Sequence, residues 1–154
     1  MIYSSACEYA VRAATYLASR AREDEGELVK LRAIAQAEGL PPPFLSSILQ
    51  KLVTAGILHS ARGPTGGYSL ALPAEEITLH DIMAAVDGVD ALDACAVGLA
   101  QCSDEMPCPL HDRWKPVREE LRGYLTGTTL AAMASAKEGK LATGGAGPED
   151  QVRG

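Results

Sequence analysis

The segment from residue 95 to residue 111 restricts the fold more than any other part of this chain. It holds three of the four cysteines, Cys95, Cys102 and Cys108, and it ends at His111. Glycine, proline and polar residues separate the cysteines, which predicts an irregular loop rather than a helix or a strand. Three thiols and an imidazole on such a loop are typical of a metal centre. The alternative, that the cysteines are small buried apolar residues, fits their polar neighbours less well.

The length of 154 residues predicts one domain, or a small domain with an appendage. No run of about 18 apolar residues occurs, so we expect no membrane-spanning segment. The first residues lack the basic and apolar regions of an export signal. We therefore expect a cytoplasmic protein. In that reducing compartment, clustered thiols favour metal binding or redox sensing over structural disulfides.

The acidic residues are unevenly distributed along the chain. The net charge is −6 and there are 20 Asp and Glu residues, yet none lies between Gly39 and Ala74. Lys51 and Arg62 both fall in that stretch. A surface without carboxylates can approach phosphates without repulsion, even when the rest of the protein is acidic. This distribution is compatible with a local nucleic-acid-binding surface.

Apolar residues at helical spacing predict three helices in the first part of the chain. The first covers about residues 5–20, with Ser5 and Glu8 as a capping box. The second is short and stops at Gly39, and the third follows three prolines and ends at Gly56. Two short helices joined by a glycine-containing turn predict a helix-turn-helix.

The third predicted helix is the one expected to enter the major groove of DNA. Its polar face carries Ser46, Ser47, Gln50 and Lys51. Two short β-strands follow, around a glycine-rich turn at residues 62–67. A hairpin directly after a helix-turn-helix is a wing. Within its turn, Arg62 has the reach and charge for a minor groove or a phosphate, and Thr65 lies beside it. The plainer alternative for Arg62 is a solvated turn residue.

Beyond the wing, Thr78 predicts the N-cap of a fourth helix that stops at Gly88. After the cysteine loop, an apolar stripe predicts a long helix that starts at about Lys115, because Pro116 is tolerated only near a helix start. A lone long helix needs a partner to cover its apolar stripe, and we expect a second copy of the chain. The residues of this expected dimer interface are Trp114, Val117, Leu121 and Leu125.

These elements predict a mainly α-helical fold with a small β-hairpin wing: a winged helix-turn-helix followed by a long dimerisation helix. The expected division places the winged helix-turn-helix in residues 1–88 and the cysteine loop in 89–111. Residues 112–136 form the dimerisation helix and a C-terminal helix, and the Gly- and charge-rich residues 137–154 form a disordered tail.

The order of these elements, with the wing sequence Arg62-Gly-Pro-Thr-Gly-Gly-Tyr68 and the run Cys108-Pro-Leu-His111, resembles the IscR/NsrR family. Its members are iron–sulfur winged helix-turn-helix transcriptional regulators. The resemblance covers about residues 1–136. It implies a homodimer that binds double-stranded promoter DNA and whose DNA affinity follows the state of an iron–sulfur cluster, in response to redox state, nitric oxide or iron supply.

The resemblance also assigns roles to residues. Cys95, Cys102, Cys108 and His111 would hold the cluster. A 2Fe–2S cluster is favoured over a 4Fe–4S cluster, and the cluster type is left open. Glu8 of the partner subunit is the alternative fourth ligand, as in the NsrR-like branch. The residues expected to contact DNA are Phe44, Ser46, Ser47, Gln50, Lys51, Arg62 and Thr65. Ser46 occupies a position at which the IscR branch carries an acidic residue. The DNA sequence that this chain would recognise is therefore left open.

Two other regulators remain as alternatives, a zinc-stabilised DNA-binding protein and a metal-free thiol redox sensor. Zinc sites usually have tighter cysteine spacing than the segment here. Cys7, on the first predicted helix, is expected to be structural. The chain shows no paired catalytic carboxylates, nucleophile motif or nucleotide-binding loop, so we do not expect an enzyme.

Overall fold

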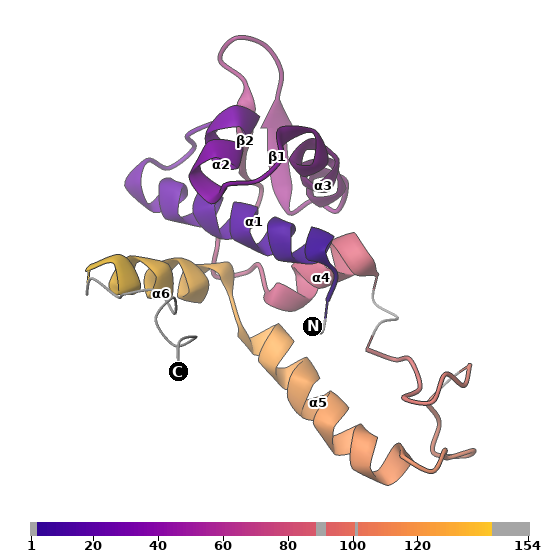
Figure 1. The fold of residues 1–154 in the computed structure, drawn as a ribbon. Helices are drawn as coiled ribbons and strands as arrows, with labels where there is room; N and C mark the ends of the chain where they lie inside the picture. Colours follow the sequence, from indigo (N-terminus) through magenta and orange to yellow (C-terminus); the bar gives the residue numbers. More distant parts are fainter. Residues whose placement is uncertain (1–2, 89–91, 101, 143–154) are drawn as a thin grey trace, which may run out of the picture.

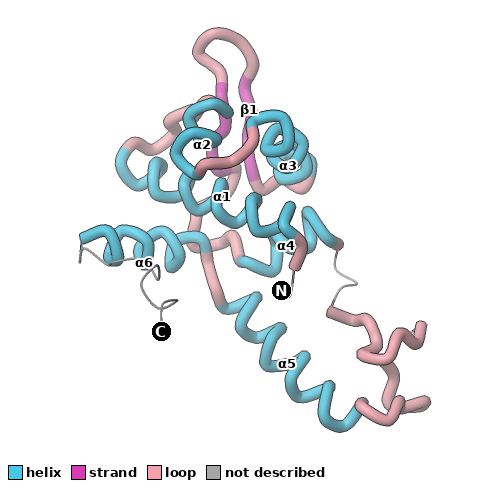
Figure 2. Tube along the Cα trace, viewed as in Figure 1, coloured by secondary structure: helices cyan, strands magenta, loops and turns pink. Residues whose placement is uncertain are grey.

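The computed structural model describes residues 3–88, 92–100 and 102–142. In that part of the chain the fold is mainly helical, with one two-stranded antiparallel sheet (Figures 1 and 2), as the sequence predicts. The elements are α1 (Ser5–Glu23), α2 (Leu31–Glu38), α3 (Pro42–Thr54), β1 (Leu58–Ala61), β2 (Gly67–Leu70), α4 (Leu79–Asp87), α5 (His111–Gly127) and α6 (Leu130–Ala142).

Helix α1 is the centre of the core. Its buried face consists largely of alanines, which lets α2, α3, α4 and α6 approach closely. The N-cap is Ser4, whose hydroxyl accepts a hydrogen bond from the Cys7 amide. The predicted capping box of Ser5 and Glu8 is therefore wrong by one residue. Ser4 also bonds to Asp87 at the end of α4, and this second contact selects it over Ser5.

Helices α2 and α3 form the predicted helix-turn-helix. Gly39 ends α2 with φ 62° and ψ 38°, a left-handed conformation that glycine adopts without strain. Pro42 and Pro43 open α3, where their missing amide hydrogens cost no hydrogen bond. Buried Ile34, Leu45 and Leu49 belong to one core with α1.

The hairpin forms the predicted wing. Leu58 pairs with Leu70 and Ala61 with Gly67, so the turn lies at residues 62–66. A Cβ atom on Gly66 would lie 2.2 Å from the Ala61 carbonyl oxygen, and one on Gly67 would lie 2.6 Å from that of Val29. Only glycine fits at these two positions. The backbone of Ala61 and Arg62 leaves no room for a Cβ at Gly66, and Val29, which pairs with Tyr68, leaves none at Gly67.

Helix α4 has the predicted capping box, formed by Thr78 and Asp81. Its start is also joined to the end of α5. Thr78 and Thr129 form an isolated β-bridge, in which the Leu79 amide donates to the Thr128 carbonyl at 2.8 Å and the Leu130 amide donates to the Ile77 carbonyl at 2.9 Å. Figure 1 shows α5 leaving the compact body from this junction.

Two predicted boundaries near the C-terminus are wrong. Helix α5 begins at His111 rather than near Lys115, and Pro116 lies inside it. Helix α6 runs to Ala142, so residues 137–142 are helical and the predicted disordered tail does not start at 137. Arg22 fixes α6 to α1 through Ser135 and Glu138, and Lys137 pairs with Glu38. Residues 143–154 of the predicted tail lie outside the described residues.

No helix within the described ranges is both long enough and apolar enough to cross a membrane.

Candidate metal centre and nucleic-acid interface

The structure brings the four predicted ligands together as two pairs. The Cys102 Sγ lies 3.4 Å from the His111 Nδ1. The side chain of Cys108 is near enough to Cys95 to help lower the pKa of the Cys95 thiol. The His111 amide donates to the Cys108 carbonyl at 2.9 Å, so the turn that begins α5 joins the two pairs. Cys95, Cys108 and His111 are buried, and Cys102 is partly buried.

The pKa of the Cys95 thiol is lowered from its ordinary value. The main cause is a hydrogen bond from the Val97 backbone amide, aided by those of Leu99 and Gly98 and by the Cys108 thiol, while burial acts in the opposite direction. Gly98, with φ 80°, allows the chain to turn back over the sulfur. The amides therefore stabilise the thiolate, which is the form of cysteine that binds metals.

A carboxylate holds the ring of His111 on its other side. The Asp104 carboxylate accepts a hydrogen bond from the His111 Nε2 at 2.8 Å and also binds the Lys115 ammonium at 2.7 Å and 2.8 Å. These two partners, Lys115 first, lower the pKa of Asp104. Because a carboxylate can only accept, Nε2 carries the proton of this contact, and Nδ1 faces the Cys102 Sγ. Asp104 and Lys115 were not singled out from the sequence.

The donors do not converge on one point. Within the described residues, no three His, Cys, Asp or Glu side chains surround a position that a single metal ion could occupy.

The fourth cysteine has a different environment. Cys7 is fully buried in α1, and its burial raises the pKa of the thiol to about 12. This agrees with the predicted structural role, because such a thiol does not ionise at neutral pH. Glu8, the alternative ligand, lies one position beyond the site of a capping box, so helix capping no longer accounts for it.

The predicted DNA-contacting residues of α3 share one exposed face. Phe44 is 46 % exposed and packs edge-on against Tyr9, with ring centroids 5.8 Å apart. Ser46, Ser47 and Gln50 are exposed beside it. Lys51 has an additional role, since its ammonium donates to the Val86 carbonyl near the end of α4 at 3.2 Å. Its charge therefore lies where α3 and α4 meet.

Arg62 and Thr65 are exposed on the wing. Arg62 forms no ion pair with any residue in the described part of the chain, so its guanidinium is available to a phosphate or a groove. Figure 1 shows α3 beside β1 of the hairpin that forms the wing.

The predicted dimer stripe is partly wrong. Val117 is 53 % exposed, and Trp114 and Leu121 are partly exposed. Leu125, however, is fully buried within the chain. It lies where α5 meets α4, so it belongs to the core and not to a dimer surface. Tyr124, at 57 % exposure, continues the accessible apolar surface in its place.

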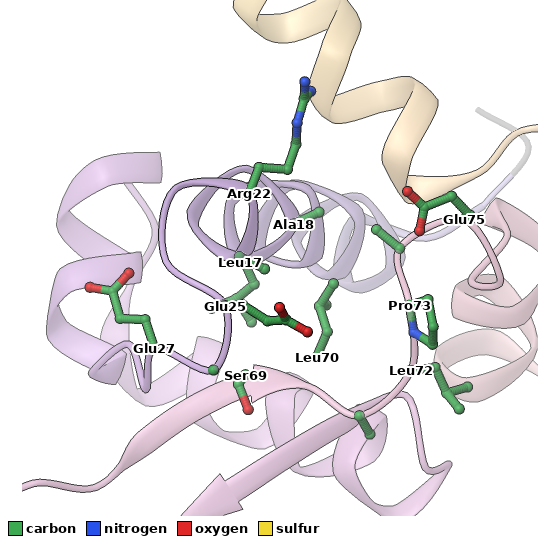
Figure 3. A pocket seen from close by; sticks show the side chains of 14 residues that line it. Leu17, Ala18, Arg22, Glu25, Glu27, Ser69, Leu70, Leu72, Pro73 and Glu75 are labelled. Carbon is green, nitrogen blue, oxygen red and sulfur yellow. The ribbon is translucent and has the colours of Figure 1, made fainter.

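A hollow elsewhere on the molecule lacks the thiol and imidazole groups of the cysteine loop. It lies between the end of α1 and the connection from β2 to α4 and is lined by Leu17, Leu70, Glu25 and Glu75 among others. Figure 3 shows Arg22 pointing away from it, toward α6. Neither a thiol nor a histidine is among its lining residues.

A protein-family model described as an iron-dependent transcriptional regulator, Rrf2, matches residues 3–136. The chain belongs to the Rrf2 family. This Rrf2 protein is therefore a DNA-binding transcriptional regulator with a helix-turn-helix, and it is not an enzyme. The resemblance drawn from the sequence is confirmed, because IscR proteins are among its relatives.

The chain is 40% identical over 135 residues to an HTH-type transcriptional regulator of Mycobacterium tuberculosis (strain ATCC 25618 / H37Rv), covering 87% of this chain and 81% of the relative. IscR of Klebsiella pneumoniae (strain 342) is 32% identical over 127 residues, or 82% and 77% of the two chains. The structure of T. potens IscR matches with a TM-score of 0.68 at 28% identity, over 94% and 92% of the chains. CymR, the global cysteine regulator of B. subtilis, matches with a TM-score of 0.73 at 26% identity, over 86% and 95%.

Proposed function

We propose that this Rrf2 regulator binds promoter DNA as a homodimer whose affinity is controlled by an iron–sulfur cluster. Cys95, Cys102, Cys108 and His111 would hold that cluster. The observation that carries the proposal is the contact between the Cys102 Sγ and the His111 Nδ1 at 3.4 Å, with Cys108 at the start of the same turn. Soft thiolates and a neutral imidazole are the ligand types of mixed Cys/His clusters.

The arrangement of the donors favours a 2Fe–2S cluster over a 4Fe–4S cluster. One pair is two thiols and the other is a thiol and an imidazole, which would supply two ligands to each of two irons. When bound, such a group supplies a redox-active, oxidant-sensitive centre. The family description as iron-dependent supports a group that contains iron.

The cysteine segment lies between the end of α4 at Asp87 and the start of α5 at His111, and Lys51 of α3 bonds to the Val86 carbonyl near the end of α4. Ligation at Cys95 to His111 would order this connection, and its loss would loosen it. The two α3 helices of a dimer would bind half-sites about 34 Å apart, so the distance between them must be fixed. A shift of α5 in one subunit relative to the other would change that distance and therefore the affinity for DNA. Phe44, Ser46, Ser47, Gln50 and Lys51 would meet the major groove, with Arg62 and Thr65 on the wing.

Two alternatives have specific support. A zinc site fits the donor types, although three donors do not converge on one point within the described residues. A metal-free thiol sensor fits the likeness to a cysteine regulator. Glu8 of the partner subunit also stays an alternative to His111 as the fourth ligand.

The test is anaerobic purification followed by an absorption spectrum and by analysis of iron, sulfide and zinc. We expect a coloured protein with iron and acid-labile sulfide in equal amounts and about two irons per chain. A colourless protein with about one zinc per chain would support the zinc alternative. A colourless protein without metal that still binds DNA in a thiol-dependent way would support the thiol sensor.

A further inference from the structure

The hollow between the end of α1 and the β2–α4 connection is large enough for a small molecule. Its volume is about 400 Å³, and ligand pockets usually have volumes of about 300–1,000 Å³. Its walls come from the end of α1, the connection from α1 to α2, strand β2 and the connection from β2 to α4 (Figure 3). An occupant would therefore contact α1 and a strand of the wing at the same time.

Much of the lining is apolar. It includes Leu17, Leu70, Leu72 and Pro73, together with alanines of α1 and of the β2–α4 connection. Leu72 is 45 % exposed, so apolar surface at this hollow is left uncovered by the rest of the chain. Removal of such surface from water favours the binding of a molecule with an apolar part.

Two of the charged lining residues already have partners. The Arg22 guanidinium pairs with Glu138 of α6 at 3.0 Å and points away from the hollow. It is the one basic residue among the described residues that line the hollow. The Glu27 carboxylate is held by two hydrogen bonds from Arg20, each of 2.9 Å.

The other two charged lining residues are carboxylates without a cation. Glu25 and Glu75 form no ion pair within the described part of the chain. They belong to different walls, Glu25 to the α1–α2 connection and Glu75 to the β2–α4 connection. Figure 3 shows the Glu25 carboxylate directed toward Leu70. The hollow thus combines apolar walls with negative charge that no lining residue neutralises.

We propose that this hollow binds a small organic cation, an amine or ammonium compound with an apolar body, and that Glu25 is its counterion. The apolar body would lie against Leu17, Leu70 and Leu72, and the charged nitrogen would meet the Glu25 carboxylate. An anion of the same shape would be repelled, because it would place like charges together. The site shares no residue with the cysteine loop and does not depend on the proposed cluster.

The experiment uses three probes that share a phenethyl group: phenethylamine, phenethyl alcohol and hydrocinnamate, which are cationic, neutral and anionic at neutral pH. Each is titrated into the full chain while the backbone amide signals are followed by NMR. The variants are Glu25→Gln, which removes the proposed counterion, and Ala21→Phe, which places a ring in the hollow. Glu76→Gln is the matched control, because it removes the same charge from an exposed residue that does not line this hollow.

We expect phenethylamine to shift the amide signals of Gly26, Leu70 and Ala71 in a saturable way. It should bind several-fold more tightly than phenethyl alcohol, and hydrocinnamate should bind most weakly. Glu25→Gln should remove most of the difference between the amine and the alcohol. The alcohol should bind this variant as it binds the parent, which also shows that the variant is folded.

Glu76→Gln should match the parent with all three probes, and Ala21→Phe should weaken the binding of both the amine and the alcohol. Equal binding of the three probes by the parent would overturn the proposal, as would shifts confined to signals away from the hollow. An affinity for phenethylamine that is the same in the parent, Glu25→Gln and Ala21→Phe would overturn it as well.

Discussion

His111 donates from its Nε2 to the carboxylate of Asp104, seven residues earlier in the chain, over 2.8 Å. This bond fixes the orientation of the ring and leaves Nδ1 directed at Cys102. A carboxylate behind a ligand histidine is a common arrangement in metal sites, and its removal typically weakens metal binding about 10–100-fold.

We expect Asp104→Ala to keep the colour of the parent protein but to lose iron to a chelator about 10–100-fold more readily. Glu105→Ala is the matched control, because Glu105 is an exposed neighbour whose carboxylate has no contact with His111 among the described residues. Equal iron retention in the two variants would show that Asp104 does not support the ligand.

Replacing Cys95, Cys102 or Cys108 by Ala should abolish the coloured cluster, because no other thiol lies near enough to substitute. Cys7→Ala should retain it, since Cys7 is buried in α1 with a raised pKa. The measurement is the visible absorption of anaerobically reconstituted protein. A parental spectrum from a triple variant of the loop cysteines would reject the assignment.

The fourth ligand can be decided separately. We expect His111→Ala to lose more of the visible absorption than Glu8→Ala, because the imidazole already contacts Cys102. The reverse order would identify Glu8 of the partner subunit as the ligand.

Because Val117 is exposed and Leu125 is buried, substitutions at these two residues of α5 should affect dimerisation and folding separately. Val117→Glu should weaken the dimer without lowering the free energy of unfolding of the winged domain, since Val117 is exposed. Leu125→Ala should instead lower the free energy of unfolding by about 2–5 kcal/mol, because it leaves a cavity in the core. Light scattering and urea denaturation measure the two effects. A stable parent monomer at micromolar concentration would contradict the predicted interface.

Arg62→Ala should weaken binding to the cognate operator by about 1–3 kcal/mol, the usual value of one good groove contact. Ser46 substitutions should change the preferred sequence more than the overall affinity, because serine carries no charge for phosphates. Titrations on cognate and scrambled duplexes at two salt concentrations test both. If Arg62→Ala bound both duplexes as the parent does, the hairpin would not be a DNA-reading wing.

The elements set by local chemistry were predictable from the sequence. Gly39 predicted a helix end through its backbone preference, and Thr78 predicted a helix start through its side chain. The pair Gly66-Gly67 predicted the turn of the wing. The choice of Ser4 over Ser5 was not predictable, because it depends on Asp87, 83 residues away. The burial of Leu125 likewise depends on how α5 meets α4.

At the candidate site, the types of candidate ligand residue and the loop that holds them could be predicted from the sequence, since cysteine clustering is a strong local signal. The residues around the ligands were not. Asp104 and Lys115 are ordinary surface charges in the sequence, and only the fold places them behind His111.

The β-bridge between Thr78 and Thr129 has a mechanical consequence for α5. It fixes the C-terminal end of a helix whose other end, at His111, carries a predicted ligand. A 17-residue helix is about 26 Å long at ~1.5 Å per residue. Any change in ligation at His111 should therefore rotate α5 about its fixed end, and displacement should grow with distance from Thr129. Trp114 would then move further than Tyr124, so two copies that pack along this helix would separate first at the end nearest the thiols.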